Sequence, residues 1–278
     1  MEAEIELRIK NLLSLLLVVV PLLATAAPKS DLWPRWQQHN PTSTLQVDHE
    51  TWTGFLQKYL VPHQPEGVHK VRFAVVTAED HQVLKAYLQQ LQKTQITQYS
   101  RSEQQAFWIN LYNAATIDLI LDHHPVASIK DISFGFFSFG PWDEKLLQVE
   151  GEPISLNDIE HRILRPIWRD PRLHYAISCA SLGCPNLEQV AFTPENTATL
   201  LDSGARAFVN HPRGVRFADD DELVLSTIYD WFDEDFGGNE AGVLAHIKQF
   251  ANPELRKQLD AFDGDIEYEY DWRLNGTP

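Results

Sequence analysis

The chain has 278 residues, of which 44% are hydrophobic and 22% are charged, and its formal net charge is −16. This composition is typical of a globular protein that can bury a sizeable core. The acidity, without any run of Lys or Arg, argues against binding of nucleic acid, whose phosphates require a basic surface, and against electrostatic docking to anionic lipid.

The N-terminus has the pattern of a signal peptide. Residues 12–23 form an apolar run that falls below the roughly 18 to 20 residues of a membrane-spanning helix, and residues 24–26 fit a small-residue cleavage site. The glutamates at 2–6 fit less well, because a signal peptide usually begins with positive charge. We therefore expect residues 1–26 to direct export to the periplasm or out of the cell, with membrane attachment only if this segment stays uncleaved.

The remainder of the chain indicates one domain. Residues 27–45 are polar and broken by prolines, and they form a lead-in segment whose Trp33 and Trp36 can pack on the core. Residues 46–275 contain no repeat and no linker, and their strands are dispersed among helices without regular βαβ alternation. This order favours an α+β fold: a single helix-rich domain with a small, mostly antiparallel sheet around a buried central helix.

The expected elements follow from periodicity and capping residues. The expected helices are 48–60, 77–91 (capped by Thr77), 103–121, 155–165 (stopped by Pro166), 193–208, 228–236, 241–250 and 253–262. The expected strands are 70–76, 145–150, 172–178, 215–217, 223–225 and 266–272, of which 215–217 and 223–225 should pair as a hairpin. A loop rich in aromatic residues, 134–142, either packs on the core or forms a wall or lid over a pocket. The acidic residues of helix 228–236 are interpreted as a solvated face, because adjacent carboxylates diverge on a helix.

The central helix is the stretch Glu103–Leu121, with Ser102 as its N-cap. It is apolar on nearly every face, which is typical of a buried helix. Asn110 and Asn113 lie three residues apart on one stripe, and buried carboxamides require hydrogen-bond partners. They either cap neighbouring loops inside the core, or one of them orients an imidazole or holds a substrate carbonyl.

Both cysteines flank a short loop that follows the expected strand 172–178. Export would permit a disulfide between Cys179 and Cys184, and closing so small a ring stabilises a fold by about 2 kcal/mol, so the bond would mainly shape the loop. Alternatively, a thiol enzyme needs a thiolate, a histidine and a group that orients the imidazole. The candidates are Cys184 or Cys179, His174 or, as a second choice, His161, and Asn113 or Asn110.

Strand geometry favours one of the two thiols. His174 and Cys179 are five residues apart, so in a continuous strand their side chains face opposite ways, whereas Cys184 can return towards the histidine after the turn. A zinc site formed by these three residues lacks an obvious fourth ligand. We expect neither a metal nor a cofactor.

Four motifs follow one another along the chain. They are Phe-Trp-Ile-Asn-Leu-Tyr-Asn-Ala at 107–114, Ile-Glu-His-Arg-Ile-Leu-Arg at 159–165, Asp-Pro-Arg-Leu-His-Tyr-Ala-Ile-Ser-Cys-Ala-Ser-Leu-Gly-Cys-Pro-Asn-Leu at 170–187, and Tyr-Asp-Trp-Phe-Asp-Glu-Asp-Phe-Gly-Gly at 229–238. Together they resemble the domain-of-unknown-function family 547 (DUF547), and the resemblance runs from about Thr51 to Ala251. Ser178 stands where the family usually has Asn. The family is similar to papain-like and transglutaminase-like thiol enzymes, and this likeness implies a related fold.

Two hypotheses about function therefore stand. In the first, which we favour until a free thiol is shown, the protein is a binding or structural module with a Cys179–Cys184 clamp and a small-molecule or peptide ligand. In the second, it is a cysteine-dependent hydrolase or acyl transferase that acts on a peptide-like amide. The distances between the two sulfurs, and from each sulfur to the ring of His174, discriminate between them.

Overall fold

The computed structural model describes residues 28–62, 66–135, 140–219 and 222–277. The expected signal peptide at 1–26 and the middle of the aromatic loop 134–142 lie outside the described residues. Within the described part, no helix is both long and apolar enough to cross a membrane.

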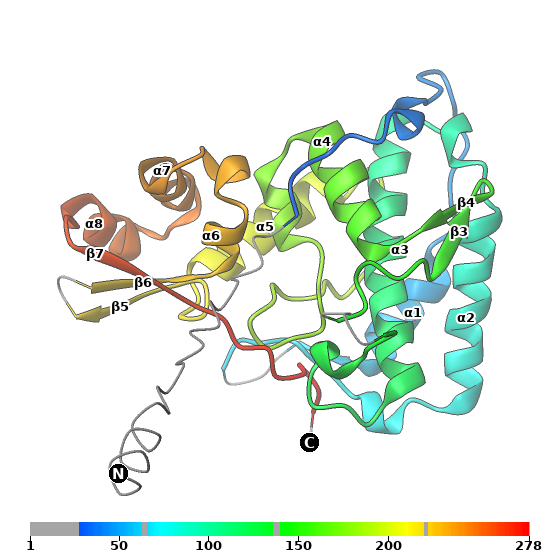
Figure 1. Ribbon diagram of the computed structural model, residues 1–278, viewed down its shortest axis with the longest axis horizontal. Coiled ribbons are helices and arrows are strands. Elements are labelled where there is room, and N and C mark those ends of the chain that lie inside the picture. The colour runs from blue at the N-terminus through cyan, green and yellow to red at the C-terminus, as the bar shows by residue number, and fades with distance from the viewer. Residues whose placement is uncertain (1–27, 63–65, 136–139, 220–221, 278) are drawn as a thin grey trace, which may run out of the picture.

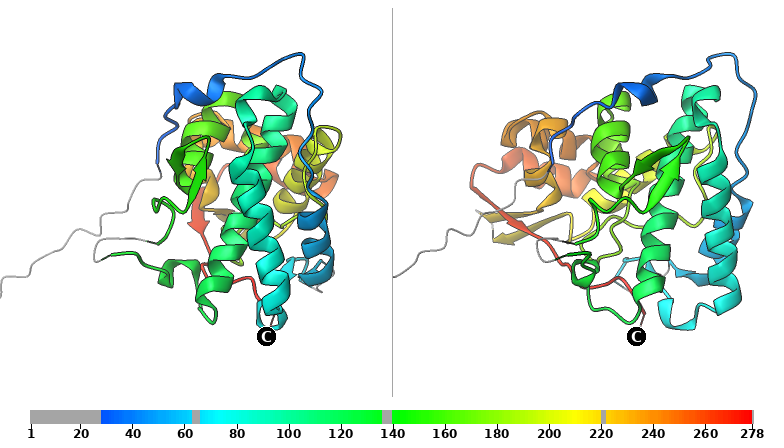
Figure 2. Two further views of the ribbon diagram at one scale, coloured as in Figure 1. Left: turned by 90° about the vertical axis from the view of Figure 1, so that its right-hand side faces the viewer. Right: turned by 45° about the vertical axis from the view of Figure 1, so that its right-hand side comes forward.

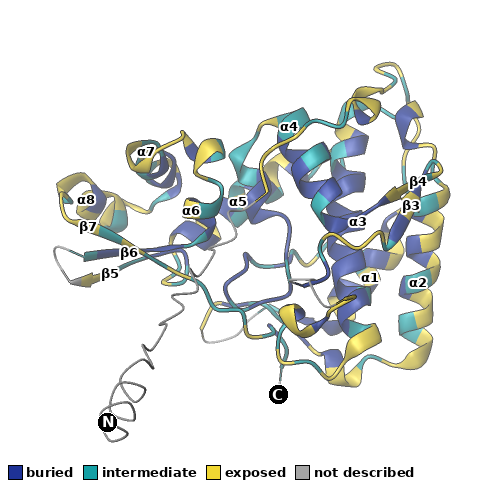
Figure 3. Cartoon of the chain, in the orientation of Figure 1, coloured by how far each residue is buried: buried dark blue, intermediate teal, exposed yellow. Residues whose placement is uncertain are grey.

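A layer of three helices forms one side of the molecule: α1 (Glu50–Tyr59), α2 (Ala78–Lys93) and α3 (Arg101–His123) (Figure 1). Nearly every face of α3 is buried, as its sequence predicts (Figure 3). The helix begins earlier than expected, because Ser100 rather than Ser102 has the extended backbone of a cap and accepts a hydrogen bond from the Glu103 N–H.

The strands form three small sheets. Two are antiparallel pairs, β1 (Leu60–Val61) with β2 (Lys70–Val71) and β3 (Leu147–Val149) with β4 (Glu152–Ile154). The third joins β5 (Val215–Asp219) to β6 (Glu222–Ser226) in the expected antiparallel hairpin and adds β7 (Asp265–Glu269) in parallel to β6. The expected class, a helix-rich α+β fold with small, mostly antiparallel sheets, is confirmed.

Short helices connect these parts. The remaining α-helices are α4 (Arg165–Trp168), α5 (Thr197–Val209), α6 (Ile228–Trp231), α7 (Glu240–Phe250) and α8 (Pro253–Ala261). The 3-10 helices are η1 (Pro34–Gln37), η2 (Phe73–Val75), η3 (Ile96–Gln98), η4 (Ile129–Asp131), η6 (Pro171–Tyr175) and η7 (Asp233–Phe236), and η5 (Asp158–Leu164) is a π-helix. The expected helix 228–236 is therefore split into α6 and η7.

Three expected strands are wrong in whole or in part, and one of them, 266–272, ends at Glu269. Residues 172–178 contain η6 instead of a strand, because Pro171 starts a helical turn and the Asp170 carboxylate accepts from the Arg172 N–H. The alternation of apolar and polar residues suggested a half-buried strand, but residues 173–175 are all buried. The expected strand 70–76 ends at Val71 and is followed by the 3-10 helix η2.

Pro166 does not stop its helix. The N–H of Arg165 bonds to the carbonyl of Glu160, five residues back, and the chain continues through Pro166 to Trp168. A proline lacks the N–H of an α-helical bond, and the wide π turn ahead of it leaves Pro166 at the start of α4, where that N–H is not needed. Such π turns are frequent at functional sites.

The lead-in segment packs across one end of the helical layer (Figure 2). Trp36 is fully buried with its ring centroid 5.1 Å from that of Trp108, and the Trp33 N–H bonds to the Arg162 carbonyl. The lead-in segment thus contributes to the core.

The buried apolar residues form two clusters. One surrounds α3, and the other joins α5, α6 and α7 to the β5–β6–β7 sheet. Leu173 and Ala176 belong to the first cluster, whereas Tyr175 belongs to the second. The η6 segment therefore lies at the seam between the clusters, and it carries His174.

Candidate functional site

A group of charged and imidazole side chains is buried at this seam. The ionic cluster consists of Glu160, His161, Arg165, His174 and Asp235, which come from η5, α4, η6 and η7. Because charged groups are rarely buried without partners, the contacts among these five residues determine their protonation states.

Arg165 is the cation of the ionic cluster, and its side chain is only 2% exposed. Its guanidinium donates to Asp235 Oδ2 at 2.5 Å, to Glu234 Oε1 at 2.9 Å and to His161 Nδ1 at 3.0 Å. Since an arginine can only donate, His161 Nδ1 must accept and carry no proton. Burial, with a further contribution from Arg165, lowers the pKa of His161 to about 3, so this imidazole is neutral.

His174 and Asp235 form the closest imidazole–carboxylate pair of the cluster. His174 Nε2 lies 2.7 Å from Asp235 Oδ2, and the ring stacks on Phe232 with centroids 4.4 Å apart. Burial lowers the pKa of His174 even though Asp235 acts in the other direction, so a neutral ring donates its Nε2–H. Burial would raise the pKa of Asp235, but the bonds from His174 and Arg165 outweigh it and lower this pKa to about 2.

Glu160 is the member of the cluster that titrates near neutrality. Burial raises the pKa of its carboxyl to about 7, although Arg165 and the Tyr112 hydroxyl both oppose the rise. Its Oε1 lies 3.8 Å from His174 Nδ1, and the Tyr112 hydroxyl donates to Oε2 at 3.3 Å. The indole of Trp142 in turn bonds to Tyr112. A polar chain thus leads from a partly exposed tryptophan to the buried carboxyl.

The two cysteines are bonded to each other, with sulfurs 2.20 Å apart. The Tyr270 hydroxyl lies 3.0 Å from Cys179 Sγ and 3.1 Å from Cys184 Sγ, and the Cys179 N–H donates to Cys184 Sγ at 2.9 Å. Burial raises the pKa of Tyr270, so the hydroxyl keeps its proton. Cys184 is 3% exposed, whereas Cys179 is partly exposed.

The side chains of the two candidate asparagines form hydrogen bonds with backbone groups. The Asn113 carboxamide accepts from the Ser178 N–H at 2.9 Å and donates to the Ala176 carbonyl at 2.8 Å, which positions the segment leading to Cys179. Asn110 makes the same pair of bonds to Phe192, beyond the disulfide loop. Asn113 therefore borders the loop, and Asn110 holds the chain that follows it.

His174 faces carboxylates at both ring nitrogens, while the two sulfurs contact Tyr270. The preference for Cys184 over Cys179 as a nucleophile rested on a strand through His174, and η6 removes that premise. Glu160 connects the two regions, since its charge acts on both Tyr270 and Arg165.

Sequence reasoning missed the inward role of Asp235, which was expected on a solvated face. Its neighbours Asp230 and Asp233 are exposed, but η7 turns Asp235 towards Arg165 and His174. No local signal in the sequence marks this role, because the buried Arg165 that requires a carboxylate partner is recognised only in the folded structure. Tyr270 was likewise read as an ordinary strand residue.

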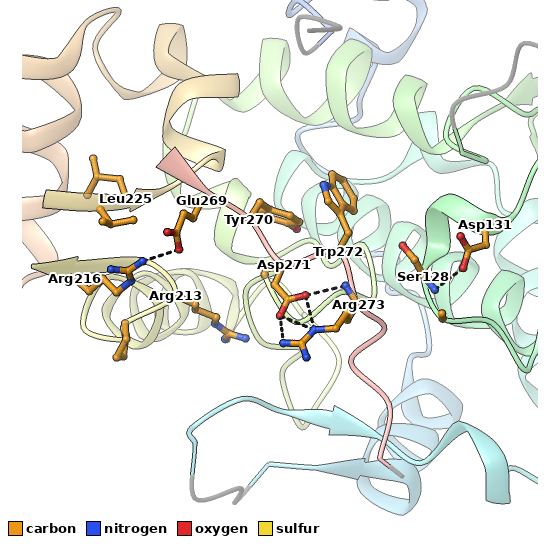
Figure 4. Close-up of a pocket in the computed structure, with 14 residues that line it drawn as sticks. Ser128, Asp131, Arg213, Arg216, Leu225, Glu269, Tyr270, Asp271, Trp272 and Arg273 are labelled. Atoms are coloured by element: carbon orange, nitrogen blue, oxygen red, sulfur yellow. Dashed lines mark hydrogen bonds and ion pairs between the residues drawn. The ribbon is translucent and has the colours of Figure 1, made fainter. Parts of the chain in front are cut away.

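A cavity of about 870 Å³ borders the disulfide loop at Gly183. Figure 4 shows the residues that line this cavity. Its wall includes Gly183 of that loop, Tyr270, Trp272 and the apolar Val224 and Leu225. Three arginines and three acidic residues form the charged part of the wall: Arg213, Arg216, Arg273, Asp131, Glu269 and Asp271.

Comparison with known proteins identifies one family. Residues 96–209 match the family model described as "Protein of unknown function, DUF547". No curated protein and no solved structure matches the chain.

Proposed function

For this chain, which carries a DUF547 domain, we propose a binding function: a module that holds a small molecule or short peptide in the cavity beside the Cys179–Cys184 loop. The observation that carries the proposal is that this loop and the cavity share a wall. Gly183 lies between the two cysteines and lines the cavity, and the hydroxyl of the wall residue Tyr270 contacts both sulfurs.

The size and lining of the cavity support this proposal. Ligand pockets usually measure roughly 300–1,000 Å³ and combine apolar walls with a few placed polar groups. A closed disulfide leaves no thiolate for catalysis. The charged groups of the ionic cluster bind to each other and are not free to act on a substrate. These features favour a fixed binding surface over a catalytic centre.

The disulfide acts in this proposal as a clamp on the cavity wall. The Gly183 N–H donates to the Asp271 carbonyl at 2.8 Å, and the Leu182 N–H donates to the Arg273 carbonyl at 2.8 Å. A Cβ on Gly183 would lie 2.9 Å from the Asp271 nitrogen, so the close approach of loop and wall requires glycine here. The bond between the cysteines keeps the loop in this position.

The test is ligand binding with the cavity open or filled. Ala127 is an exposed wall residue, so Ala127→Trp fills the cavity without disturbing the core, and Ala261→Trp at the exposed end of α8 is the matched control. We expect a mixture of N-acetyl tripeptides to raise the Tm of the wild type and of Ala261→Trp saturably, but not that of Ala127→Trp. Equal effects on all three proteins, or no effect on the wild type, would refute a binding role for the cavity.

The proposal includes export, because a stable clamp requires an oxidising compartment. Cleavage after residue 26 would deliver a mature protein that begins at Ala27. The mass of the protein recovered from the periplasm or medium tests this, and a full-length chain confined to the cytoplasm would contradict it.

A second candidate function is a thiol hydrolase or acyl transferase that becomes active on reduction. Cys184 Sγ accepts the Cys179 N–H and faces the Tyr270 hydroxyl, and two such donors would stabilise a Cys184 thiolate once the disulfide opens. Fast iodoacetamide labelling of Cys184 in the reduced protein below neutral pH, lost in Tyr270→Phe, would support this candidate. Labelling of Cys179 alone would rule out Cys184 as the nucleophile.

A further inference from the structure

Within the part of the chain that the structure describes, one arginine of the cavity wall has no carboxylate partner. Arg213 donates from Nη1 to the Leu182 carbonyl at 3.1 Å and from Nη2 to Asn186 Oδ1 at 2.7 Å, and its Nε is buried without a hydrogen-bond partner. Among the described residues, no carboxylate forms an ion pair with Arg213. A buried donor left unpaired costs roughly 1–3 kcal/mol, and more when it is charged.

The other two arginines of the wall are already paired with carboxylates, and its remaining acid caps a helix. Arg216 pairs with Glu269 at 2.6 Å, and Arg273 pairs with Asp271 at 2.5 Å. Asp131 accepts from the Ser128 N–H at 3.0 Å and thereby caps η4 (Figure 4). The unmatched positive charge of the cavity therefore belongs to Arg213.

The surroundings of Arg213 hold it in place. The turn that contains it is fixed by the Gly214 N–H bonded to the His211 carbonyl at 2.8 Å, and a Cβ on Gly214 would lie 2.1 Å from the Phe208 carbonyl oxygen. The guanidinium sits over the Phe208 ring, 5.5 Å from its centroid. Burial lowers the pKa of Arg213 to about 10, which leaves it charged at neutral pH.

We propose that Arg213 is an oxyanion-binding subsite of the cavity and receives a carboxylate or phosphate group of the ligand. An oxyanion held against the guanidinium would supply the missing countercharge and accept from the N–H groups that remain on Nη1 and Nη2, and a planar guanidinium suits both groups. The net charge of −16 would repel anions from the protein as a whole, so binding here is a local property. This inference rests on the proposed binding function and names the chemistry of its ligand.

The test compares three probes on the full mature chain at constant ionic strength. They are the N-acetyl tripeptide mixture with free carboxyl ends, the same mixture as C-terminal amides, and inorganic phosphate. Binding is followed by Tm and by the ¹H–¹⁵N resonance of the Arg213 Nε–H, which is assigned by its absence in Arg213→Lys. We expect the acids to bind about tenfold or more tightly than the amides and to shift this resonance, because a charge-assisted hydrogen bond is stronger than a neutral one.

The phosphate arm identifies the source of the oxyanion. A saturable shift of the Arg213 resonance by phosphate, relieved by the peptide acids, assigns a subsite open to both groups, whereas a shift by the acids alone assigns a carboxylate subsite. Arg213→Gln should abolish the preference for acids over amides, and Arg256→Gln, which removes an exposed arginine on α8, should keep it.

The outcomes separate this inference from the function on which it rests. Equal binding of acids and amides with an unchanged Arg213 resonance overturns the oxyanion subsite but leaves the binding function intact. Absence of binding by all three probes overturns both. Because Arg213 also supports the Leu182 carbonyl, Arg213→Gln can lose stability, and the wild-type comparison of acids with amides then decides by itself.

Discussion

Removal of the Asp235 carboxylate probes the electrostatics of the ionic cluster. Asp235→Ala deletes the acceptor shared by Arg165 and His174 and leaves Arg165 with Glu234 as its remaining carboxylate partner. The Arg165 side chain is 2% exposed, whereas those of Glu234 and Asp235 are 50% and 21% exposed. Breaking a buried ion pair costs roughly 3–5 kcal/mol, and the partial exposure of Asp235 favours the lower end, about 3 kcal/mol.

A loss of about 3 kcal/mol corresponds to a decrease in Tm of roughly 6–12 °C for a domain of this size. Calorimetry of the wild type, Asp235→Ala and the control Asp230→Ala, which removes an exposed acid nearby, measures the difference. The folded-state pKa of Asp235, about 2, lies below its ordinary value of 3.8, so its stabilisation is present above that value and lost as the pH falls towards 2. Equal Tm values for Asp235→Ala and Asp230→Ala at neutral pH would refute the buried pair.

Further predictions concern the buried carboxyl of Glu160, the carboxamide of Asn113 and Gly183 of the loop. Glu160→Gln should stabilise the protein above neutral pH by up to about 3 kcal/mol. The pKa of Glu160 is about 7 in the folded protein against an ordinary 4.5, so this carboxyl favours folding below pH 4.5 and loses that advantage as the pH rises through 7. A difference in urea unfolding that does not depend on pH would contradict this. Asn113→Ala should lower the free energy of unfolding by about 3 kcal/mol in the same assay, because it leaves a buried N–H and a buried C=O unpaired. A loss no larger than that of a surface asparagine would show that these bonds contribute little. Gly183→Ala should lower the free energy of unfolding by about 1–3 kcal/mol, because the added methyl group overpacks against Asp271, and it should weaken tripeptide binding in the cavity. Unchanged binding would show that the loop does not contribute to ligand binding.

The sequence predicted the elements whose signals are local. The α3 helix, the β5–β6 hairpin and the Thr77 cap of α2 each follow from periodicity or capping chemistry within a few residues. The strand predicted around His174 is wrong because the environment of this segment is set by distant parts of the chain. Both sides of η6 are buried between two clusters, so the alternation that distinguishes a half-buried strand carried no information.

The candidate site could be predicted only in part. The asparagine–histidine–cysteine constellation was visible as residue types, but the partners of His174 come from Glu160 and Asp235, which are distant in sequence. A carboxylate on an acidic helix reads as solvated until the fold supplies Arg165 on its inner side. Such long-range pairing depends on tertiary packing and leaves no periodic trace in the chain.

The redox state of the two cysteines tests the clamp most directly. Intact mass of the mature protein, purified from its oxidising compartment, is measured with and without reductant and is followed by iodoacetamide labelling. We predict that reduction adds the mass of two hydrogen atoms and that neither cysteine is labelled beforehand, as the closed Cys179–Cys184 bond requires. A protein that emerges already reduced, with Cys184 alkylated rapidly below neutral pH, would contradict the clamp and favour the thiol enzyme.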